Sequence, residues 1–470
     1  MKATRIGLAA LLALLASGLT ACDRISLPSP FEEKIRTPPL ADAIILDPTV
    51  TYQTMVGWET NAGIGSVDFI VDFQKWSGAA VELAVNGLGI NRVRLEIKSG
   101  AENPVDSFTP YMNGTLSRAA WKAGWYTPVN DDADPNTINL SGFQFSALDH
   151  SIDTVVLPMK QLVEANGETL YVNLNYVDFE TTSGLHHQDP DEYAEFMLAT
   201  FQHMQSKYGF VPDAIEIILE PDNSLWDGSK IGLSIVATAN LLQANGFAPP
   251  DFVGPSTTSM AIAIDYFDDM IGVPGVSGLL TEISYHRYRG TSAANAQKLA
   301  DRAAEHGLRT AMLEHIGADY HELHEDLTVG NISSWQQFTL AFPSSDNGAH
   351  YFIIGNPTGA SPTVSYGDRT RYLRQYFKYI RAGAQRIEAT RTDGFSPAAF
   401  VNADGGYVVV VKADRAGEFT LRGLPPGRYG ISYTTESENN VELANVGINF
   451  QNEDIAVAIR GSGVITVYSK

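Results

Sequence analysis

Short apolar runs alternate with amphipathic segments from about residue 54 to residue 380. Eight runs have the length and composition of strands, at 54–58, 90–97, 169–176, 214–220, 252–256, 279–288, 309–315 and 349–355. Several of the segments between them carry apolar residues at helical spacing. Eight strand–helix repeats predict a (β/α)8 TIM barrel over residues 54–380. A doubly wound open sheet is the alternative, but no glycine-rich loop follows the first strand.

The pattern changes after residue 380. Runs such as YVVVVKA (407–413) and GVITVYS (463–469) are short, rich in β-branched residues and separated by turns such as NADGG (402–406). Short strands at regular spacing are typical of antiparallel sheets packed face to face. We therefore expect residues 381–470 to form a C-terminal β-sandwich.

The N-terminus has two basic residues, an apolar run and then small residues, which predicts a signal peptide over residues 1–21. The stretch LTAC (19–22) resembles the lipobox of bacterial lipoproteins, in which the cysteine becomes the lipidated first residue. Cys22 is also the only cysteine. We expect a lipid anchor on Cys22 at a bacterial membrane and a proline-rich tether over residues 22–43. An ordinary signal peptide with a chance cysteine is the alternative.

The chain of 470 residues has a formal net charge of −22. This charge argues against nucleic acid as a partner, because binding to phosphates needs clustered lysine and arginine. It fits a protein of the cell envelope or one that handles neutral ligands.

Two glutamates end predicted strands: Glu220 closes the fourth, in AIEIILE (214–220), and Glu314 the seventh, in RTAMLE (309–314). Active sites of such barrels lie at the C-terminal ends of the strands, so the two carboxylates are expected to face each other across the mouth. Two facing carboxylates are what glycoside hydrolysis requires. The plainer alternative for Glu220 is a strand that surfaces in the turn-forming sequence PDN (221–223).

Around these glutamates the chain resembles clan A of the glycoside hydrolases, most closely family 30, over about residues 44–470. DPTVTYQTMVGWETNAG (47–63) is similar to the opening of such enzymes, where a glycine–aromatic turn lines the site. YFKYIRAGAQRIEAT (376–390) is similar to their junction with the sandwich. The resemblance implies a retaining glycoside hydrolase in which residues 44–53 join the sandwich and Trp58 contacts the substrate.

The same resemblance assigns roles to five side chains. Glu220 matches the acid/base and Glu314 the nucleophile, and Arg94, at the end of the second strand, matches an arginine that orients the nucleophile. His286 and Tyr288, in SYHRY (284–288), match residues that contact the nucleophile or the sugar. An acid/base in this role is expected to have a raised pKa, with the charge on Glu314 as the cause.

The sequence departs from the clan pattern just before the acid/base. Most members carry asparagine there, holding the sugar 2-hydroxyl, and this chain has Leu219. Asn173, Asn175 and Asn223 are the candidates to replace that contact. The departure also keeps open a second function, a catalytically impaired barrel that binds glycans as an envelope lipoprotein.

A long connection from Ser99 to Asp149 is expected to shape the cleft. It carries Phe108, Tyr111, Trp121, Trp125 and Tyr126. The two tryptophans are candidate platforms for sugar rings, and the alternative is that the rings pack a small core of the loop itself.

Other polar residues suggest no further chemistry. Glu59, Glu96 and Glu282 near strand ends are expected to be structural carboxylates. Two groups of histidines, His186–His187 and His315–His321–His324, lack a recognised ligand motif, so no metal or cofactor is expected. The leading hypothesis is a lipid-anchored retaining hydrolase of β-linked glucan or a related polysaccharide.

Overall fold

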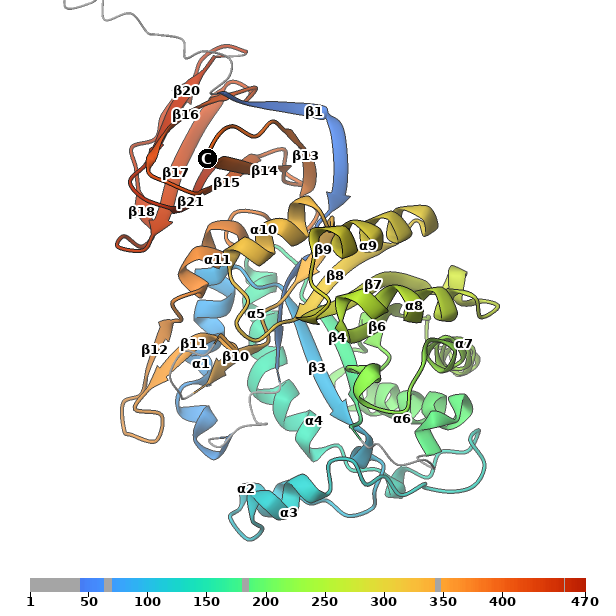
Figure 1. Cartoon of the computed structure of the whole chain (residues 1–470). Helices are drawn as coiled ribbons and strands as arrows, with labels where there is room; N and C mark the ends of the chain where they lie inside the picture. Colours follow the sequence, from blue (N-terminus) through green and yellow to red (C-terminus); the bar gives the residue numbers. More distant parts are fainter. Residues whose placement is uncertain (1–42, 63–69, 180–185, 343–347, 452) are drawn as a thin grey trace, which may run out of the picture. The chain divides into compact units, whose positions relative to one another are not determined.

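The structure is a computed structural model that describes residues 43–62, 70–179, 186–342, 348–451 and 453–470. Its strands form one sheet of eleven strands and one of ten (Figure 1). Within the described ranges, none of the helices combines the length and the apolar character needed to cross a bilayer. Cys22 and the predicted signal peptide lie outside these ranges.

Eight parallel strands close into a barrel, which confirms the predicted fold class. They are β2 (Gly57–Asn61), β3 (Arg92–Lys98), β4 (Tyr171–Val177), β5 (Ala214–Glu216), β6 (Asp251–Ser259), β7 (Leu280–Arg289), β8 (Arg309–Glu314) and β9 (Ile332–Trp335). The closing contact is between the first and last of them, with Gly57 opposite Ser334 and Trp58 opposite Trp335. Such closure removes the exposed sheet edges that an open sheet would leave.

Helices fill the connections between the strands (Figure 1). They are α1 (Ser77–Glu82), α2 (Phe108–Met112), α3 (Arg118–Ala123), α4 (Ser146–Ser151), α5 (Leu157–Ala165), α6 (Pro190–Tyr208), α7 (Gly228–Ala244), α8 (Met260–Ile271), α9 (Ala293–His306), α10 (Tyr320–Thr328) and α11 (Thr370–Phe377). The start of α6 follows from its sequence: the Asp189 carboxylate accepts a hydrogen bond from the Asp191 amide, and Pro190 occupies the first turn.

Two strand assignments made from the sequence are wrong. The run at 349–355 is β11 (His350–Gly355), which pairs with β10 (Thr339–Phe342) and β12 (Thr363–Tyr366) outside the closed barrel. The eighth barrel strand is instead β9, whose sequence ISSW carries two buried serines and little apolar signal. The first barrel strand covers 57–61 rather than 54–58, which moves Trp58 from its end to its beginning.

The C-terminal strands form an antiparallel sheet with its own core, as predicted. They are β13 (Gln385–Ala389), β14 (Phe395–Val401), β15 (Tyr407–Ala413), β16 (Gly417–Arg422), β17 (Gly427–Thr435), β18 (Val441–Glu442), β19 (Val446–Ile448), β20 (Ile455–Ile459) and β21 (Gly463–Ser469). Val409, Val411, Ile465 and Val467 are buried in that core.

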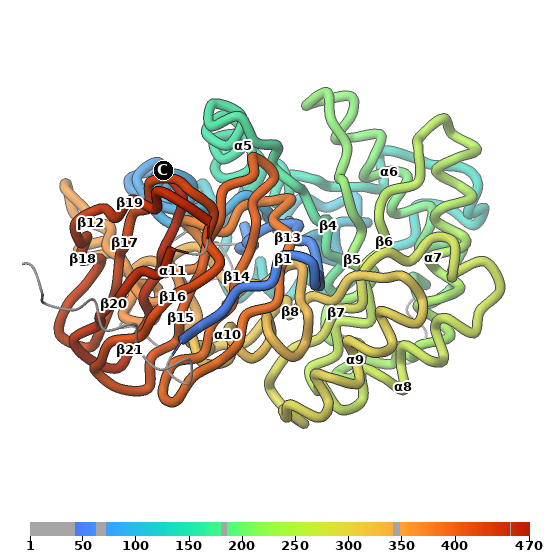
Figure 2. Tube along the Cα trace, turned by 90° about the horizontal axis from the view of Figure 1, so that it is seen from above, coloured from blue at the N-terminus to red at the C-terminus, as the bar shows by residue number. Residues whose placement is uncertain are grey.

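One strand of this sheet comes from the other end of the chain. β1 (Ala43–Thr54) lies between β13 and β16, antiparallel to the first and parallel to the second. Figure 2 shows β1 beside β13. Ile44 and Leu46 of β1 are buried with the sandwich side chains.

A polar contact also joins the two parts of the fold. Gln375 of α11 is fully buried, and its side-chain amide donates to the hydroxyls of Ser432 and Thr434 at 3.2 Å each. The Thr466 hydroxyl donates to the Gln375 backbone carbonyl at 2.7 Å. Because buried polar groups are costly unless paired, these bonds fix α11 against β17 and β21.

Candidate active site

Glu220 lies four residues beyond the end of β5, in a turn that the following sequence holds in place. Its backbone is left-handed, with φ 51° and ψ 60°, which is rare for a residue with a side chain and is typical of functional sites. The Glu220 amide donates to the Ser256 carbonyl at 3.1 Å. Asp222 accepts a hydrogen bond from the Thr258 amide at 2.8 Å, which ties the turn to β6. Both Glu220 and Asp222 are therefore tied to β6.

Glu314 is the last residue of β8, the seventh strand of the barrel, and is 6% exposed. Its Oε1 accepts a hydrogen bond from the Tyr288 hydroxyl at 2.9 Å, and its Oε2 accepts one from the Arg94 guanidinium. Hydrogen bonds to a carboxylate from a guanidinium and a phenol also fix its orientation. Both oxygens of Glu314 are therefore held in place.

His286 connects the two glutamates. It lies opposite Glu314 in the β7–β8 ladder, and its Nδ1 is 3.1 Å from Oε1 of Glu220. One carboxylate oxygen of Glu220, one ring nitrogen of His286 and one carboxylate oxygen of Glu314 all lie within 4.8 Å of one another. The two predicted catalytic carboxylates thus share one site, and a histidine lies against both.

Two arginines of β3 form buried ion pairs inside the barrel. Arg94 is the third residue of β3, not its last as expected from the sequence, and it is fully buried. Two residues earlier, Arg92 forms an ion pair with Glu59 and a two-pronged one with Glu282, at 2.7 and 3.0 Å. These buried pairs confirm that Glu59 and Glu282 are structural carboxylates. Arg94 itself forms the contact with Glu314 described above and lies 4.0 Å from Glu216.

The pKa of Glu220 differs from the expectation. Burial raises it, but hydrogen bonds from His286 and from the Asn223 side chain, the latter at 2.8 Å, outweigh burial and leave the pKa below its usual value of 4.5. For His286 the balance is the reverse: burial lowers its pKa, but the hydrogen bond to Glu220 and the charge of Glu314 raise it above 6.5. The expectation of a raised Glu220 pKa considered only repulsion from Glu314. It overlooked His286, whose hydrogen bond to Glu220 lowers the pKa.

The three candidate asparagines lie in different places. Asn173 is fully buried and donates to Glu59 and Glu216, both at 3.1 Å, so its amide is used inside the barrel. Asn175 is also fully buried, but neither its amide nitrogen nor its amide oxygen has a hydrogen-bond partner among the described residues. Asn223 donates to Glu220. Of the three, Asn175 is therefore the one whose side-chain amide could still form hydrogen bonds.

Trp58 does not lie at the mouth. Its side chain is 1% exposed, stacks on Phe377 with ring centroids 4.3 Å apart, and donates from Nε1 to the Ile380 carbonyl at 2.7 Å. A ring buried in this way has no free face for a sugar. The assignment of Trp58 as a substrate contact is therefore corrected to a core residue, because the first strand begins rather than ends at this position.

The aromatic residues of the long connection form a small core of their own. Trp121 is 6% exposed and stacks on Tyr111 at 4.6 Å, beside Phe108. Trp125 makes an edge contact with Trp121. The ammonium groups of Lys98 and Lys122 lie 4.8 and 4.9 Å from the centroid of the Trp125 ring. This arrangement favours the packing alternative for Trp121.

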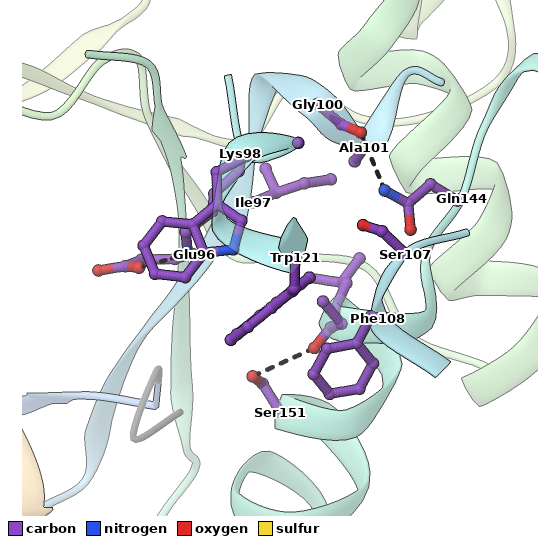
Figure 3. A pocket seen from close by; sticks show the side chains of 14 residues that line it. Glu96, Ile97, Lys98, Gly100, Ala101, Ser107, Phe108, Trp121, Gln144 and Ser151 are labelled. Carbon is purple, nitrogen blue, oxygen red and sulfur yellow. Dashed lines mark hydrogen bonds and ion pairs between the residues drawn. The ribbon is translucent and has the colours of Figure 1, made fainter. Parts of the chain in front are cut away.

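A cavity of about 70 Å³ adjoins this aromatic core. Figure 3 shows Trp121, Phe108 and Ser107 around it, together with Glu96 and Lys98 from the end of β3. Glu96 accepts hydrogen bonds from Asn61 and from Lys98, the latter at 3.2 Å. Asn61 and Lys98 are polar strand-end residues that sequence reasoning missed. Their position as the last residues of β2 and β3 was the available signal, but it needed the correct strand boundaries.

No protein family and no curated protein matches the sequence. Solved structures match its fold. A GH30 endoxylanase from Clostridium papyrosolvens is 17% identical, with a TM-score of 0.61 over 91% of this chain and 100% of that one. The endo-beta1,6-glucanase BT3312 is 15% identical, with a TM-score of 0.61 over 91% and 94%. A conserved exported protein from Bacteroides fragilis is 13% identical, with a TM-score of 0.65 over 91% and 100%. The chain thus shares the barrel-and-sandwich fold of these proteins across most of its length.

Proposed function

We propose that the protein is a retaining glycoside hydrolase that cleaves β-linked glucan or a related polysaccharide. The observation that carries the proposal is the separation of Glu220 and Glu314, whose nearest carboxylate oxygens lie within 4.8 Å. Retaining enzymes place their two carboxyl groups about 5–5.5 Å apart, whereas inverting enzymes need about 6.5–9.5 Å to admit a water molecule. This short separation of the nearest oxygens supports the retaining geometry, in which a carboxylate attacks directly.

In the first step, a carboxylate oxygen of Glu314 attacks the anomeric carbon of the sugar. The bond from that carbon to the glycosidic oxygen breaks, and the leaving oxygen takes a proton from Glu220. The product of this step is a sugar joined covalently to Glu314, with Glu220 ionised. Arg94 and Tyr288 orient Glu314 for the attack through the two hydrogen bonds that they donate to it.

In the second step, Glu220 takes a proton from water and the hydroxide attacks the same carbon. The bond to Glu314 breaks, which releases a sugar with its original anomeric configuration, and the proton taken from water leaves Glu220 in its acid form for the next cycle. Two inversions give net retention, and no cofactor is consumed.

We further propose that His286 holds the catalytic proton before the substrate binds. The hydrogen bonds that Glu220 accepts favour its ionised form, while His286 Nδ1 lies 3.1 Å from the same carboxylate. A proton can move between atoms at this distance without other rearrangement. When a sugar covers the pair and excludes water, transfer to Glu220 removes two buried charges, which favours the acid form.

The polysaccharide class rests on analogy with structural neighbours that are named an endoxylanase and an endo-beta1,6-glucanase. The second candidate function, a glycan-binding protein without turnover, rests on Leu219, an apolar side chain that is 5% exposed where most clan members present an asparagine. We propose that Asn175 replaces that asparagine, because its amide atoms are buried and unpartnered.

Incubation of the purified protein with a panel of β-linked polysaccharides tests the proposal. We expect cleavage of at least one glucan or xylan, and proton NMR during the first minutes should show products with the configuration of the substrate. Initial products of opposite configuration would contradict the retaining mechanism. Binding without product on every polysaccharide would favour the glycan-binding alternative.

We also propose that Cys22 is lipidated and that residues 22–43 tether the folded part of the chain, with its barrel (54–380) and its sandwich (44–53 and 381–470), to a bacterial membrane. The support is the lipobox-like LTAC sequence and the presence of a single cysteine. A neighbour from Bacteroides fragilis is named an exported protein, which agrees with an envelope location.

A further inference from the structure

A second cluster of ionisable side chains lies apart from the catalytic pair. Glu102, which follows β3, accepts hydrogen bonds at its Oε2 from His186 Nε2 at 2.8 Å and from His187 Nε2 at 2.5 Å. One oxygen and two ring nitrogens of these residues lie within 4.8 Å of one another. The proposed hydrolytic mechanism uses none of the three.

The other polar atoms of the cluster are held by a second layer of contacts. The His187 Nδ1 is 2.9 Å from the Tyr176 hydroxyl, and the Glu102 Oε1 accepts a hydrogen bond from the Asp131 amide at 2.9 Å. Glu102 and His187 are 2% and 0% exposed, whereas the side chain of His186 is 19% exposed. Metal-binding histidines and carboxylates are oriented by partners of this kind at their remaining polar atoms.

The charge around the cluster favours a cation. Glu195 on α6 is 2% exposed, and its Oε1 has no hydrogen-bond partner among the described residues. Burial and the negative charges of Asp131, Glu192 and Glu102 raise the pKa of Glu195 to about 8. In the described part of the chain, the two imidazoles are the only basic groups within ion-pair distance of Glu102. No lysine or arginine there neutralises Glu102, so a divalent cation would complement it.

We propose that Glu102, His186 and His187 bind a Zn²⁺ ion or another first-row divalent cation of similar preference. Two imidazole nitrogens and one carboxylate oxygen suit zinc, whereas calcium and magnesium prefer oxygen ligands throughout. Three protein ligands leave a fourth position for water. Binding would replace the contacts of both Nε2 atoms with Glu102 by metal–ligand bonds, while the contact of His187 Nδ1 with the Tyr176 hydroxyl keeps that ring in place.

The site would join two connections at the mouth of the barrel. Glu102 lies in the connection after β3, and the histidines lie in the 3-10 turn His186–Gln188 after β4. A bound ion would cross-link these segments beside the cleft, which assigns it a structural role at the rim rather than a step in catalysis.

Calorimetric titration of the tag-free, chelator-treated protein with Zn²⁺ tests the proposal. We expect one ion per chain, a rise in melting temperature with Zn²⁺, and the visible absorption bands of tetrahedral Co²⁺ when cobalt replaces zinc. His186→Ala, which changes a partly exposed side chain, and Glu102→Gln should each weaken Zn²⁺ binding at least about tenfold. His203→Ala is the matched control, since His203 pairs with Asp149 at 2.7 Å elsewhere and has similar exposure, and it should bind as the wild type does.

Two further measurements separate this site from other sources of binding. Glu220, His286 and Glu314 also bring ligand atoms within 4.8 Å, so Glu220→Gln reports on any zinc bound there. The proposal is overturned if wild-type protein binds no Zn²⁺, if His186→Ala binds it unchanged, or if Glu220→Gln alone removes it. Preference for Ca²⁺ over Zn²⁺ would likewise overturn the assigned ligand set.

Discussion

His286 Nδ1 lies 3.1 Å from Oε1 of Glu220, and this contact sets the protonation of the proposed acid. The contact lowers the pKa of Glu220 from its usual 4.5 and raises that of His286 from its usual 6.5, so it favours a proton on the histidine over one on the carboxylate. The two groups are coupled, so the titration belongs to the pair as a whole.

Replacement of His286 should therefore change the pH profile of activity. The wild-type pair keeps its proton until the pH exceeds the raised pKa of His286, so the basic limb of kcat/KM should lie above pH 6.5. In His286→Asn the proton can rest only on Glu220, which also loses the hydrogen bond that lowers its pKa, and we expect the basic limb to move to lower pH, toward the range of a buried carboxyl group. Initial rates across a pH series measure this. A limb that stays in place, or that shifts equally in His203→Asn, would contradict the proton-holding role.

The two glutamates should fail in different ways when changed. Glu314→Gln removes the nucleophile, so we expect no turnover above background on any substrate. Glu220→Gln should lower kcat/KM by about 10²–10⁴ on polysaccharide but much less on aryl glycosides whose leaving groups need no proton. Added azide should restore part of the turnover of Glu220→Gln on aryl glycosides. Equal losses on both substrate classes would argue against Glu220 as the acid.

Two tyrosines of β7 offer a matched pair of variants. The Tyr288 hydroxyl donates to Glu314 and the Tyr285 hydroxyl to Asp326, both at 2.9 Å. A hydrogen bond to a charged group contributes about 1.5–3 kcal/mol, so Tyr288→Phe should lower kcat by about 10–100-fold with little change in melting temperature. Tyr285→Phe should instead lower the melting temperature and leave kcat nearly unchanged. Loss of stability without loss of rate in Tyr288→Phe would place that hydroxyl outside the proposed mechanism.

The long connection after β3 should respond to Trp121→Ala by loosening. Trp121 is 6% exposed among Tyr111 and Phe108, and removal of such a ring costs about 3–5 kcal/mol in a packed core. We expect faster limited proteolysis within residues 99–149 and unchanged affinity for oligosaccharides. Leu140→Ala, in the same connection but 59% exposed, should have little effect. A weakened affinity with normal protease resistance would restore Trp121 as a sugar platform.

The lipid anchor can be tested by fractionation. Cys22→Ala should prevent lipidation, so the protein should become soluble in the envelope or accumulate with its signal peptide. Immunoblots of membrane and soluble fractions measure both outcomes. Normal processing together with membrane association in the variant would rule out Cys22 as the anchor.

The sequence predicts the barrel, the sandwich and the two facing glutamates because each depends on a local pattern. Apolar strands with glutamates at their ends specify β8 and Glu314 directly. The prediction fails where strand pairing, and not the local pattern, determines which strand joins the barrel. The barrel strand β9 is short and contains serines, whereas the strongly apolar β11 pairs outside the barrel. The Trp58 error has the same origin, since a shift of a strand boundary moves a side chain from mouth to core. The Glu220 pKa could not be inferred, because it depends on a histidine 66 residues away in the chain.

The position of β1 between β13 and β16 affects how the protein can be synthesised and divided. Thr54 of β1 and its partner Gln385 are 331 residues apart, so at about 5–20 residues per second the ribosome needs roughly a quarter of a minute to one minute to supply the partner after β1 emerges. During that interval β1 has an unpaired edge of the kind that aggregates. A gene fragment that begins after residue 54 would leave β13 and β16 without the strand that joins them. The sandwich therefore cannot be separated from the N-terminal end of the chain. Its strand β1 is synthesised before the barrel, and the strands that pair with it are synthesised after the barrel.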